Sequence, residues 1–315
     1  MKARFPSAFK LSPEIIQALQ TNQPVVALES TVITHGLPFP QNLLLAQDME
    51  REVRAPGAVP ATIAVLDGQV WVGLSQAQLQ RIAAEENLLK ISSRDFAQAI
   101  AQRRSGGTTV AGTLVAAHAV GIRVFATGGI GGVHRQAPFD VSADLHLLAR
   151  TPLVVVCAGA KAILDLPATL EVLETLGVPV VGYRTDEFPA FFSINSGLPV
   201  SVRADSPAMA AQIAKAHWEM GLSSAVLVVQ PPPEESALAG PVVESAIQQA
   251  LQEAQEAGIH GQAVTPFLLK RVSELTHGTS LLANLALLRN NASLAAQIAL
   301  ELSNMIDVGW VEDGS

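Results

Sequence analysis

A single lysine, Lys161, interrupts a long uncharged stretch of the sequence, and no other charged residue lies between Arg150 and Asp165. An amine kept away from water loses its proton more easily, and its lone pair can then attack a carbonyl carbon. The natural chemistry of such a lysine is a Schiff base with a carbonyl compound such as an opened sugar. The alternative is a lysine that pairs with Asp165 or another acid at a helix start.

Glu29 directly follows the apolar run Val25–Leu28, and His35 and Gly36 come shortly afterwards. In an open α/β sheet, ligands bind beyond the carboxyl ends of the strands, so Glu29 is placed for catalysis. An apolar environment raises the pKa of a carboxyl group, which favours a role as general acid. The alternatives are a glutamate that caps a nearby helix and, for His35, a structural hydrogen bond.

Two glycine-rich segments, 105–113 and 126–134, each adjoin a predicted helix or buried strand. Glycines let the backbone approach a ligand, and a helix N-terminus offers free N–H groups to an anion. Lys90 ends another apolar run and is a candidate ligand for the same anion, although its ammonium could instead extend into solvent. Together these features favour a phosphorylated substrate over two ordinary turns.

Two carboxylates, Asp140 and Asp144, lie four residues apart and would share one face if a helix begins here. Their repulsion calls for compensation by a divalent cation, substrate hydroxyls or backbone N–H groups. Oxygen ligands suit Mn²⁺ or Mg²⁺ better than Zn²⁺. The alternatives are a helix N-cap for Asp140 and a solvated side chain for Asp144.

Short apolar runs alternate with longer helical patterns, which predicts an α/β fold with helices covering both faces of a largely buried sheet. The predicted strands are 25–28, 62–66, 70–72, 88–91, 124–126, 153–157, 178–181 and 225–229. The predicted helices are 13–19, 41–53, 75–86, 94–103, 108–120, 168–176, 207–219, 243–257, 266–275 and 280–302. The last helix carries only Arg289 and Glu301 as charges, so most of its circumference must be buried.

The composition excludes several classes of protein. Of the 315 residues, 49% are hydrophobic and 15% charged, and 20 basic against 28 acidic residues give a net charge of −8. This composition predicts a globular protein, and the negative net charge argues against nucleic acid as its main partner. We expect no membrane span either, because the uncharged stretch 105–122 is predicted to be a buried helix. The single cysteine, Cys157, fits a reducing compartment, and the first 25 residues do not resemble a signal peptide, so we expect a cytoplasmic protein.

No clean linker divides the chain, so we expect one catalytic domain over residues 1–315 with a short N-terminal extension of about residues 1–11. The proline-rich segment 230–235 is the strongest break in the pattern. We interpret it as a surface loop rather than a domain boundary, because the helices after it are too apolar to stand alone.

The motifs together resemble the pseudouridine-5′-phosphate glycosidase family, also called the indigoidine synthase A-like family. The resemblance covers about residues 12–305. The segments that carry it are ALESTVITHGLP (27–38), GAVPATIAVLDG (57–68), VGL (72–74), KISSRD (90–95), GGTTVAGT (106–113), FATGGIGGVHR (125–135), FDVSADL (139–145), GAKAILD (159–165), GVPVVGYRTDEFPAFF (177–192), TPFLL (265–269) and SLLANLALLRNNA (280–292).

The resemblance implies an α/β/α sandwich, assembled as a homotrimer, that reversibly converts pseudouridine 5′-phosphate into uracil and ribose 5-phosphate. It implies that Lys161 forms an imine adduct with C1′ of the ring-opened ribose and that Glu29 exchanges a proton with the uracil. Asp140 matches the family's ligand to Mn²⁺, for which Mg²⁺ is a possible substitute. The substrate contacts implied are Lys90, Val110, Thr127 (at the phosphate), Ser142, Ala143, Asp144 and Asn284.

Two other functions remain open at this stage. A lysine-dependent, aldolase-like lyase acting on another sugar phosphate would keep the Lys161 chemistry but need no uracil pocket. A non-catalytic binding protein of a pigment pathway would keep the fold alone. The chain also departs from the family at Cys157, where a small polar residue is expected, and at His277, where a small or amide residue is expected.

Overall fold

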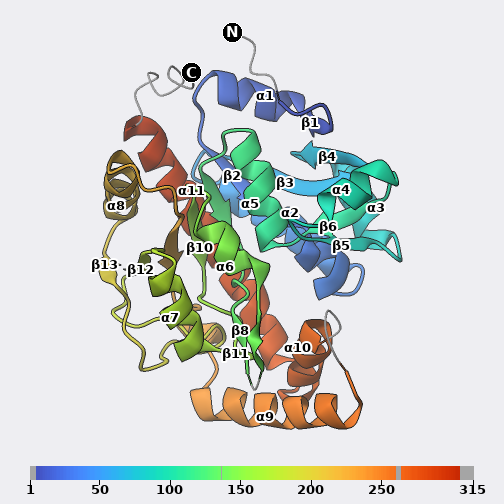
Figure 1. Ribbon diagram of the computed structural model, residues 1–315, viewed down its shortest axis with the longest axis vertical. Coiled ribbons are helices and arrows are strands. Elements are labelled where there is room, and N and C mark those ends of the chain that lie inside the picture. The colour runs from blue at the N-terminus through green and yellow to red at the C-terminus, as the bar shows by residue number, and fades with distance from the viewer. Residues whose placement is uncertain (1–4, 136, 260–263, 306–315) are drawn as a thin grey trace.

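The computed structural model describes residues 5–135, 137–259 and 264–305, and an 11-stranded mixed sheet forms its centre (Figure 1). The strand order is β1-β4-β3-β2-β7-β10-β14-β12-β13, with β6 pairing with β3 and β5 with β6. The strands are β1 (Phe9–Leu11), β2 (Val25–Leu28), β3 (Val59–Leu66), β4 (Gln69–Val72), β5 (Leu89–Ile91), β6 (Gly106–Thr108), β7 (Val124–Ala126), β10 (Val154–Cys157), β12 (Val180–Tyr183), β13 (Val202–Ala204) and β14 (Val226–Val229).

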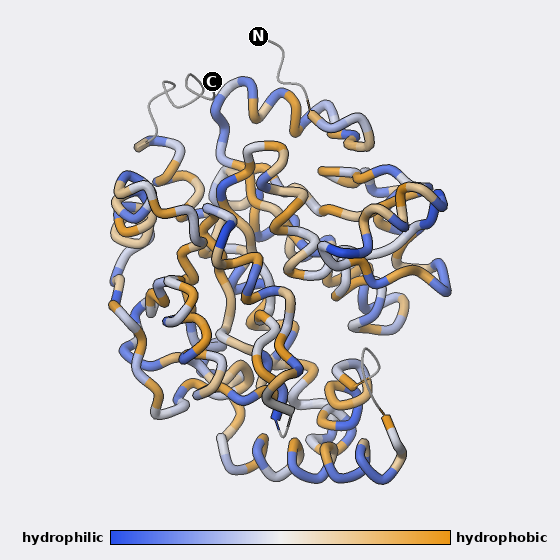
Figure 2. Tube along the Cα trace, viewed as in Figure 1, coloured by the Kyte–Doolittle hydropathy of each residue, from blue (hydrophilic) through white to orange (hydrophobic). Residues whose placement is uncertain are grey.

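The middle of the sheet is parallel and apolar. Strands β2, β7, β10, β14 and β12 run in the same direction, and every residue in them is buried. Runs of valine suit this position because the branched side chain packs well on a pleated surface. Figure 2 shows the hydrophobic colours concentrated along these strands, so the apolar runs of the sequence mark the centre of the core.

Helices cover both faces of the sheet, which confirms the predicted three-layer α/β arrangement (Figure 1). They are α1 (Pro13–Gln20), α2 (Gln41–Arg54), α3 (Gln76–Ala84), α4 (Phe96–Ala101), α5 (Val110–Ala119), α6 (Ala143–Leu148), α7 (Leu166–Thr175), α8 (Pro207–Glu219), α9 (Gly240–Glu256), α10 (Val264–Leu275) and α11 (Thr279–Met305). Serine side chains cap α1, α3 and α8 at Ser12, Ser75 and Ser206, as expected where a helix begins after a loop.

The last helix, α11, crosses the sheet behind β2, β7 and β10 and packs against α2 and α8 (Figure 1). Its buried residues include the polar Ser280 and Asn291 as well as many leucines and alanines. The prediction that most of its circumference is buried is therefore confirmed. This helix brings the C-terminal part of the chain beneath the strands that end at Glu29 and Thr127.

Some local predictions were wrong. Residues 106–108, expected at or before a helix start, form the short strand β6 between β3 and β5, and α5 begins at Val110. Pairing with distant segments of the same chain leaves no periodic pattern in a strand of three residues. A second sheet of β8 (Val133–His134), β9 (Ala137–Val141) and β11 (Leu164–Asp165) was not predicted either.

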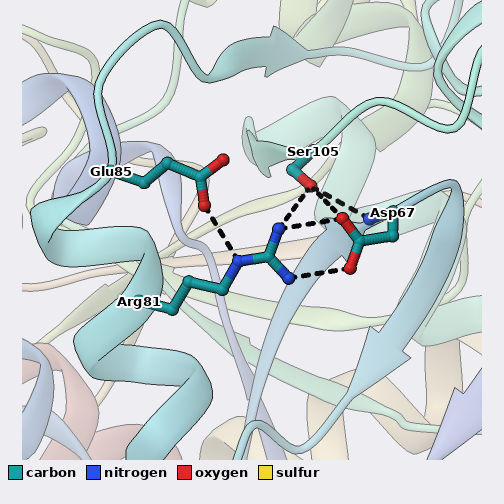
Figure 3. A network of polar contacts seen from close by, with 4 residues as sticks. All are labelled: Asp67, Arg81, Glu85 and Ser105. Carbon is teal, nitrogen blue, oxygen red and sulfur yellow. Dashed lines mark hydrogen bonds and ion pairs between the residues drawn. The ribbon is translucent and has the colours of Figure 1, made fainter.

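A polar network at the outer edge of the sheet ties three segments together (Figure 3). The Arg81 guanidinium donates to both carboxylate oxygens of Asp67 at 2.8 Å and to Glu85 at 2.9 Å. The backbone N–H of Asp67 donates to the hydroxyl of Ser105 at 2.9 Å. The Asp67, Arg81 and Glu85 side chains are exposed to solvent and Ser105 is partly buried, so the network fixes the surface around the start of β6.

Within the described residues, no helix is long and apolar enough to cross a membrane. The stretch 105–122, whose low charge raised the question, contributes β6 and the buried helix α5.

Candidate active site

Glu29, Thr127 and Lys161 follow three adjacent parallel strands. Strand β2 ends at Leu28, which lies beside Ala126 of β7, and Ala126 in turn lies beside Val156 of β10. Glu29 and Thr127 come directly after β2 and β7, and Lys161 comes four residues after β10. The carboxyl ends of parallel strands share one edge, so this order of strands places the predicted acid and the predicted nucleophile together.

Glu29 accepts a hydrogen bond at Oε1 from the hydroxyl of Thr127. Burial raises the pKa of the Glu29 carboxyl, while the positive charge of Lys161 and the Thr127 hydrogen bond oppose that rise. A raised pKa was predicted from the apolar run before Glu29, and the structure confirms it. The group can therefore hold a proton nearer to neutral pH than an exposed glutamate does.

Lys161 lies in the loop between β10 and β11, and neighbouring segments fix its backbone. Its N–H donates to the carbonyl of Ile130 at 3.1 Å, and its carbonyl accepts from Leu164 at 2.9 Å. The Arg135 guanidinium donates to the carbonyls of Ala162 and Leu164, and Glu244 of α9 pairs with the same guanidinium at 2.6 Å. The lysine is thus on a loop held at both ends, not at a helix start.

Lys90 of β5 belongs to the same group of charges. Its side chain is partly buried, and burial together with the nearby charge of Lys161 lowers its pKa, while Asp144 and Glu29 act in the opposite direction. The electrostatic influence is mutual, because Lys161, Asp144 and Lys90 also affect Glu29. The structure therefore brings two lysines and two carboxylates, predicted from four separate segments, to one site.

Asp144 is 6% exposed and uses both carboxylate oxygens on backbone N–H groups. Oδ1 accepts from Ala111 at 2.9 Å and Oδ2 from Gly131 at 2.7 Å. Ser142 caps α6 and accepts from the N–H of Asp144 at 3.2 Å. Asp144 is therefore not the solvated residue considered as an alternative, and its carboxylate joins the first turn of α5 to the loop after β7.

The glycine-rich segments pack against protein atoms. A Cβ on Gly129 would lie 2.6 Å from the Phe191 ring, one on Gly131 2.2 Å from the Ser142 hydroxyl, and one on Gly132 2.3 Å from Thr169. At the start of α5, the N–H groups of Ala111 and Gly112 donate to the side chains of Asp144 and Thr109. Close packing is thus one reason for Gly129, Gly131 and Gly132, in addition to the phosphate cradle that the sequence suggested.

The remaining predicted residues lie on several elements. Asp140 is an exposed residue of β9, so no helix begins there and the two aspartates do not share a helix face; the N-cap of α6 is Ser142, which also excludes the N-cap alternative for Asp140. Val110 is buried as the first residue of α5, Ala143 is exposed as the first residue of α6, and Asn284 is partly buried on α11. Among residues 5–135, 137–259 and 264–305, no three His, Cys, Asp or Glu side chains gather into a metal site.

Sequence reasoning missed two buried amides beside this site, Gln230 and Asn291. Asn291 donates to the carbonyl of Thr127 and accepts from Gln230. Their signal in the sequence was weak: an asparagine among the leucines and alanines of a buried helix, and a glutamine between the valines of β14 and three prolines.

The comparisons with known proteins decide the family. A model of the family described as "Indigoidine synthase A like protein" matches residues 14–301. The chain belongs to this family. A pseudouridine-5′-phosphate glycosidase of Solibacter usitatus is 54% identical to it over 295 residues, covering 93% of this chain and 99% of the relative. A protein of the same name from Paracoccus denitrificans is 55% identical over 302 residues, covering 95% and 99%.

Two solved structures share the fold over nearly the whole chain. A prealnumycin C-glycosynthase in complex with ribulose 5-phosphate is 41% identical, with a TM-score of 0.88, and the match covers 95% of this chain and 98% of that one. An indigoidine synthase A-like protein from Thermotoga maritima is 37% identical, with a TM-score of 0.86, covering 94% and 96%. The family assignment therefore rests on the sequence and fold of nearly the whole chain and not on a single motif.

Proposed function

We propose that this chain is a pseudouridine-5′-phosphate glycosidase, which reversibly cleaves the C–C glycosidic bond of pseudouridine 5′-phosphate to give uracil and ribose 5-phosphate. The observation that carries the proposal is the placement of Glu29 and Lys161 at the same edge of the sheet, after the parallel strands β2 and β10 that flank β7, with the charge of Lys161 acting on Glu29. The names of relatives at 54% and 55% identity support the same substrate.

In the proposed reaction, the Lys161 amine bonds to C1′ as the C1′–O4′ bond breaks and opens the ribose ring, and the ring oxygen becomes a hydroxyl by taking up the proton that the amine loses. The nitrogen lone pair then forms a C=N bond as the bond between C1′ and the uracil ring breaks. The electron pair of that bond passes to the uracil carbon, which takes a proton from Glu29. Water releases ribose 5-phosphate from the imine and restores the amine, so an electron sink at C1′ replaces the second carboxylate of ordinary glycosidases.

The other site residues would bind the substrate. The partly buried Lys90 supplies positive charge for a phosphate or a sugar oxygen. The resemblance assigns further contacts to Val110, Thr127, Ser142, Ala143, Asp144 and Asn284. Since Asp144 and Thr127 already make hydrogen bonds within the protein, we propose that they also fix the shape of the site into which the substrate fits.

We also propose that the enzyme uses Mn²⁺, with Mg²⁺ as a substitute, held by Asp140. A single exposed carboxylate suits an ion of this class, which keeps several waters and needs only one or two protein carboxylates. When bound, such an ion supplies positive charge beside an anionic substrate. Titration of Mn²⁺ followed by calorimetry should show binding to the wild-type protein and weaker binding to Asp140→Asn.

A homotrimer in the cytoplasm remains our expectation for the assembly and location. The sparse charge and the exposed apolar side chains Phe39, Leu44 and Leu282 on or beside α2 and α11 support an assembly that covers part of this surface. Light scattering coupled to size-exclusion chromatography measures the mass directly, and a monomer would contradict this expectation.

The test of the proposed function is a product assay. The purified protein is incubated with pseudouridine 5′-phosphate and Mn²⁺, and the products are separated by chromatography beside those of Lys161→Ala. We expect uracil and ribose 5-phosphate from the wild type and neither from the variant. A folded, metal-loaded wild-type protein that releases no uracil would overturn the proposal.

One observation favours a second candidate. The solved relative that is a C-glycosynthase was crystallised with ribulose 5-phosphate, so a fold of this family also accommodates a ketose phosphate. A lyase or synthase acting on another sugar phosphate would retain Lys161 but release no uracil. Incubation with a set of sugar phosphates and borohydride separates the two candidates.

A further inference from the structure

Asn291 is a fully buried amide in the middle of α11, with 0% of its surface exposed. Its Nδ2 group donates to the carbonyl of Thr127 at 2.8 Å and lies 3.4 Å from the carbonyl of Gly128. A buried amide that lost these partners would leave polar groups without hydrogen bonds, which costs free energy. The position of this side chain is therefore tightly determined.

Gln230, the first residue after β14, fixes the other end of the Asn291 amide. Its Nε2 group donates to Oδ1 of Asn291 at 3.0 Å, and its side chain is buried as well. This bond settles the orientation of the asparagine, because Oδ1 must accept from Gln230 and Nδ2 must donate to Thr127. Two elements distant in sequence thus hold one backbone carbonyl at the end of β7.

Thr127 transmits this constraint to Glu29. Its N–H donates to the carbonyl of Val156 at 3.0 Å, so both of its backbone polar groups are engaged, and its hydroxyl donates to Glu29 Oε1. A hydroxyl on a short side chain can point at a carboxylate only if its backbone is held in place. The hydrogen bonds therefore form one chain, from Gln230 through Asn291 and Thr127 to Glu29.

We propose that Asn291, oriented by Gln230, is a positioning residue that holds the Thr127 hydroxyl on the carboxylate of Glu29. The inference rests on the proposed function, in which Glu29 moves the proton. Asn291 itself does not touch the carboxylate. Its effect on the reaction passes through the backbone of Thr127.

The charged groups around Glu29 determine what loss of this chain should do. Lys161 and Lys90 stabilise the carboxylate, Asp144 opposes it, and the Thr127 hydroxyl stabilises it. If the hydroxyl turns away, one group favouring the charged form is lost while the lysines and Asp144 remain. The titration of Glu29 should then move to higher pH.

The experiment measures this titration without substrate, by difference infrared spectroscopy of the protonated carboxyl band that disappears in Glu29→Gln. Asn291→Leu, which keeps the approximate shape but removes both hydrogen bonds, should shift that titration to higher pH. Where the wild type releases uracil, the same variant should lower kcat about tenfold with little change in KM, because misplacement of a reacting group lowers the rate. Asn291→Ser, which retains a hydrogen-bond donor, should recover part of both effects.

A double-mutant cycle tests whether Asn291 acts through Thr127. The titration shift in Thr127→Val/Asn291→Leu should equal that in Thr127→Val alone. The matched control is Asn42→Leu, because Asn42 is also buried and donates to two carbonyls, those of Ile33 and Ala83, but does not contact Thr127. It should lower stability in urea without moving the titration of Glu29.

An unshifted titration in a folded Asn291→Leu protein, or shifts that add in the double variant, would overturn the inference. If Asn291→Leu does not fold, Gln230→Leu replaces it in the same two comparisons and should give a smaller shift in the same direction. A wild type that releases no uracil would overturn the proposed function instead, and the infrared titration would still test the chain of hydrogen bonds.

Discussion

Two pairs of side chains in this molecule have the same chemistry and different surroundings. Glu29 accepts from the hydroxyl of Thr127, and Glu50 of α2 accepts from the hydroxyl of Thr62 on β3 at 2.6 Å. In both pairs burial raises the pKa of the carboxyl group and the threonine hydrogen bond opposes that rise. Neither burial nor a raised pKa therefore distinguishes the glutamate of the site from the structural one.

The difference lies in the neighbouring charges and in position along the strands. Glu29 follows the carboxyl end of β2 and lies within electrostatic reach of Lys161 and Lys90. Glu50 comes from the middle of a helix, and the charges that affect it are those of Arg54 and Glu14, which pair with each other at the surface. A carboxyl group with a raised pKa therefore indicates catalysis only where a second reactive group lies at the same edge of the sheet.

The largest effect on the rate of uracil release should come from replacing Glu29, and the same replacement of Glu50 is the matched control. Glu29→Gln should slow uracil release about 10²- to 10⁴-fold, the usual contribution of a general acid. Glu50→Gln should leave the rate unchanged. Initial rates of uracil formation measure both variants. Similar rates for the two would contradict the assignment of a catalytic role to Glu29 and a structural role to Glu50.

A buried and an exposed aspartate sharpen the comparison at the level of stability. Asp144→Asn should lower the free energy of unfolding by about 1–3 kcal/mol. Two backbone N–H groups donate to Asp144, and in the variant one of them would face the NH₂ group of the amide, which cannot accept. Asp67→Asn in the exposed network of Figure 3 should cost about 0.2–1 kcal/mol. Urea unfolding measures both, and equal losses would contradict the role assigned to burial.

The two glutamates should also affect stability in a pH-dependent way. A carboxyl whose folded pKa lies above its ordinary value of 4.5 stabilises the fold fully below that pH and loses this contribution as pH rises through the folded pKa. Glu29→Gln and Glu50→Gln should therefore gain stability relative to wild type as pH rises above about 4.5. Urea midpoints at a series of pH values test this, and a difference that does not vary with pH would refute it.

The smallest effect should follow from Arg81→Ala. The Arg81 side chain makes several ion pairs, but it is 40% exposed and its partners also face solvent. Exposed pairs of this kind contribute about 1 kcal/mol or less, so the midpoint of unfolding should move little and uracil release should not change. A marked loss of activity would show that the surface around β6 influences Lys90 on the adjoining strand.

The sequence predicted the buried strands well because short, valine-rich runs such as Val154–Cys157 suit strands that are covered on both faces. Periodicity likewise placed α2, α8 and α11 within a few residues of their observed bounds. It could not place β6 or β9, because short strands depend on partners elsewhere in the chain. Asp140 illustrates this. It lies on β9, and α6 begins three residues later at Ala143, so Asp140 is on a strand while Asp144 is on a helix.

The candidate site was predicted from residue types, and its geometry was not. Glu29 and Lys90 stood out as charges at the ends of apolar runs, and Lys161 as the only charge within a long uncharged stretch. No feature of the sequence paired Glu29 with Thr127 or Thr127 with Asn291, because residues 98 and 164 positions apart meet only once the strand order is known. Glycines proved ambiguous, because close packing and ligand binding select the same residue.

We propose that Lys161 forms the bond to the sugar and that Lys90, in the same group of charges, does not. The most direct measurement is to add borohydride during turnover of pseudouridine 5′-phosphate and to locate the reduced sugar-phosphate adduct by peptide mass spectrometry. We predict an adduct on the peptide that carries Lys161 and none in Lys161→Ala. An adduct on Lys90, or none during active release of uracil, would contradict the account.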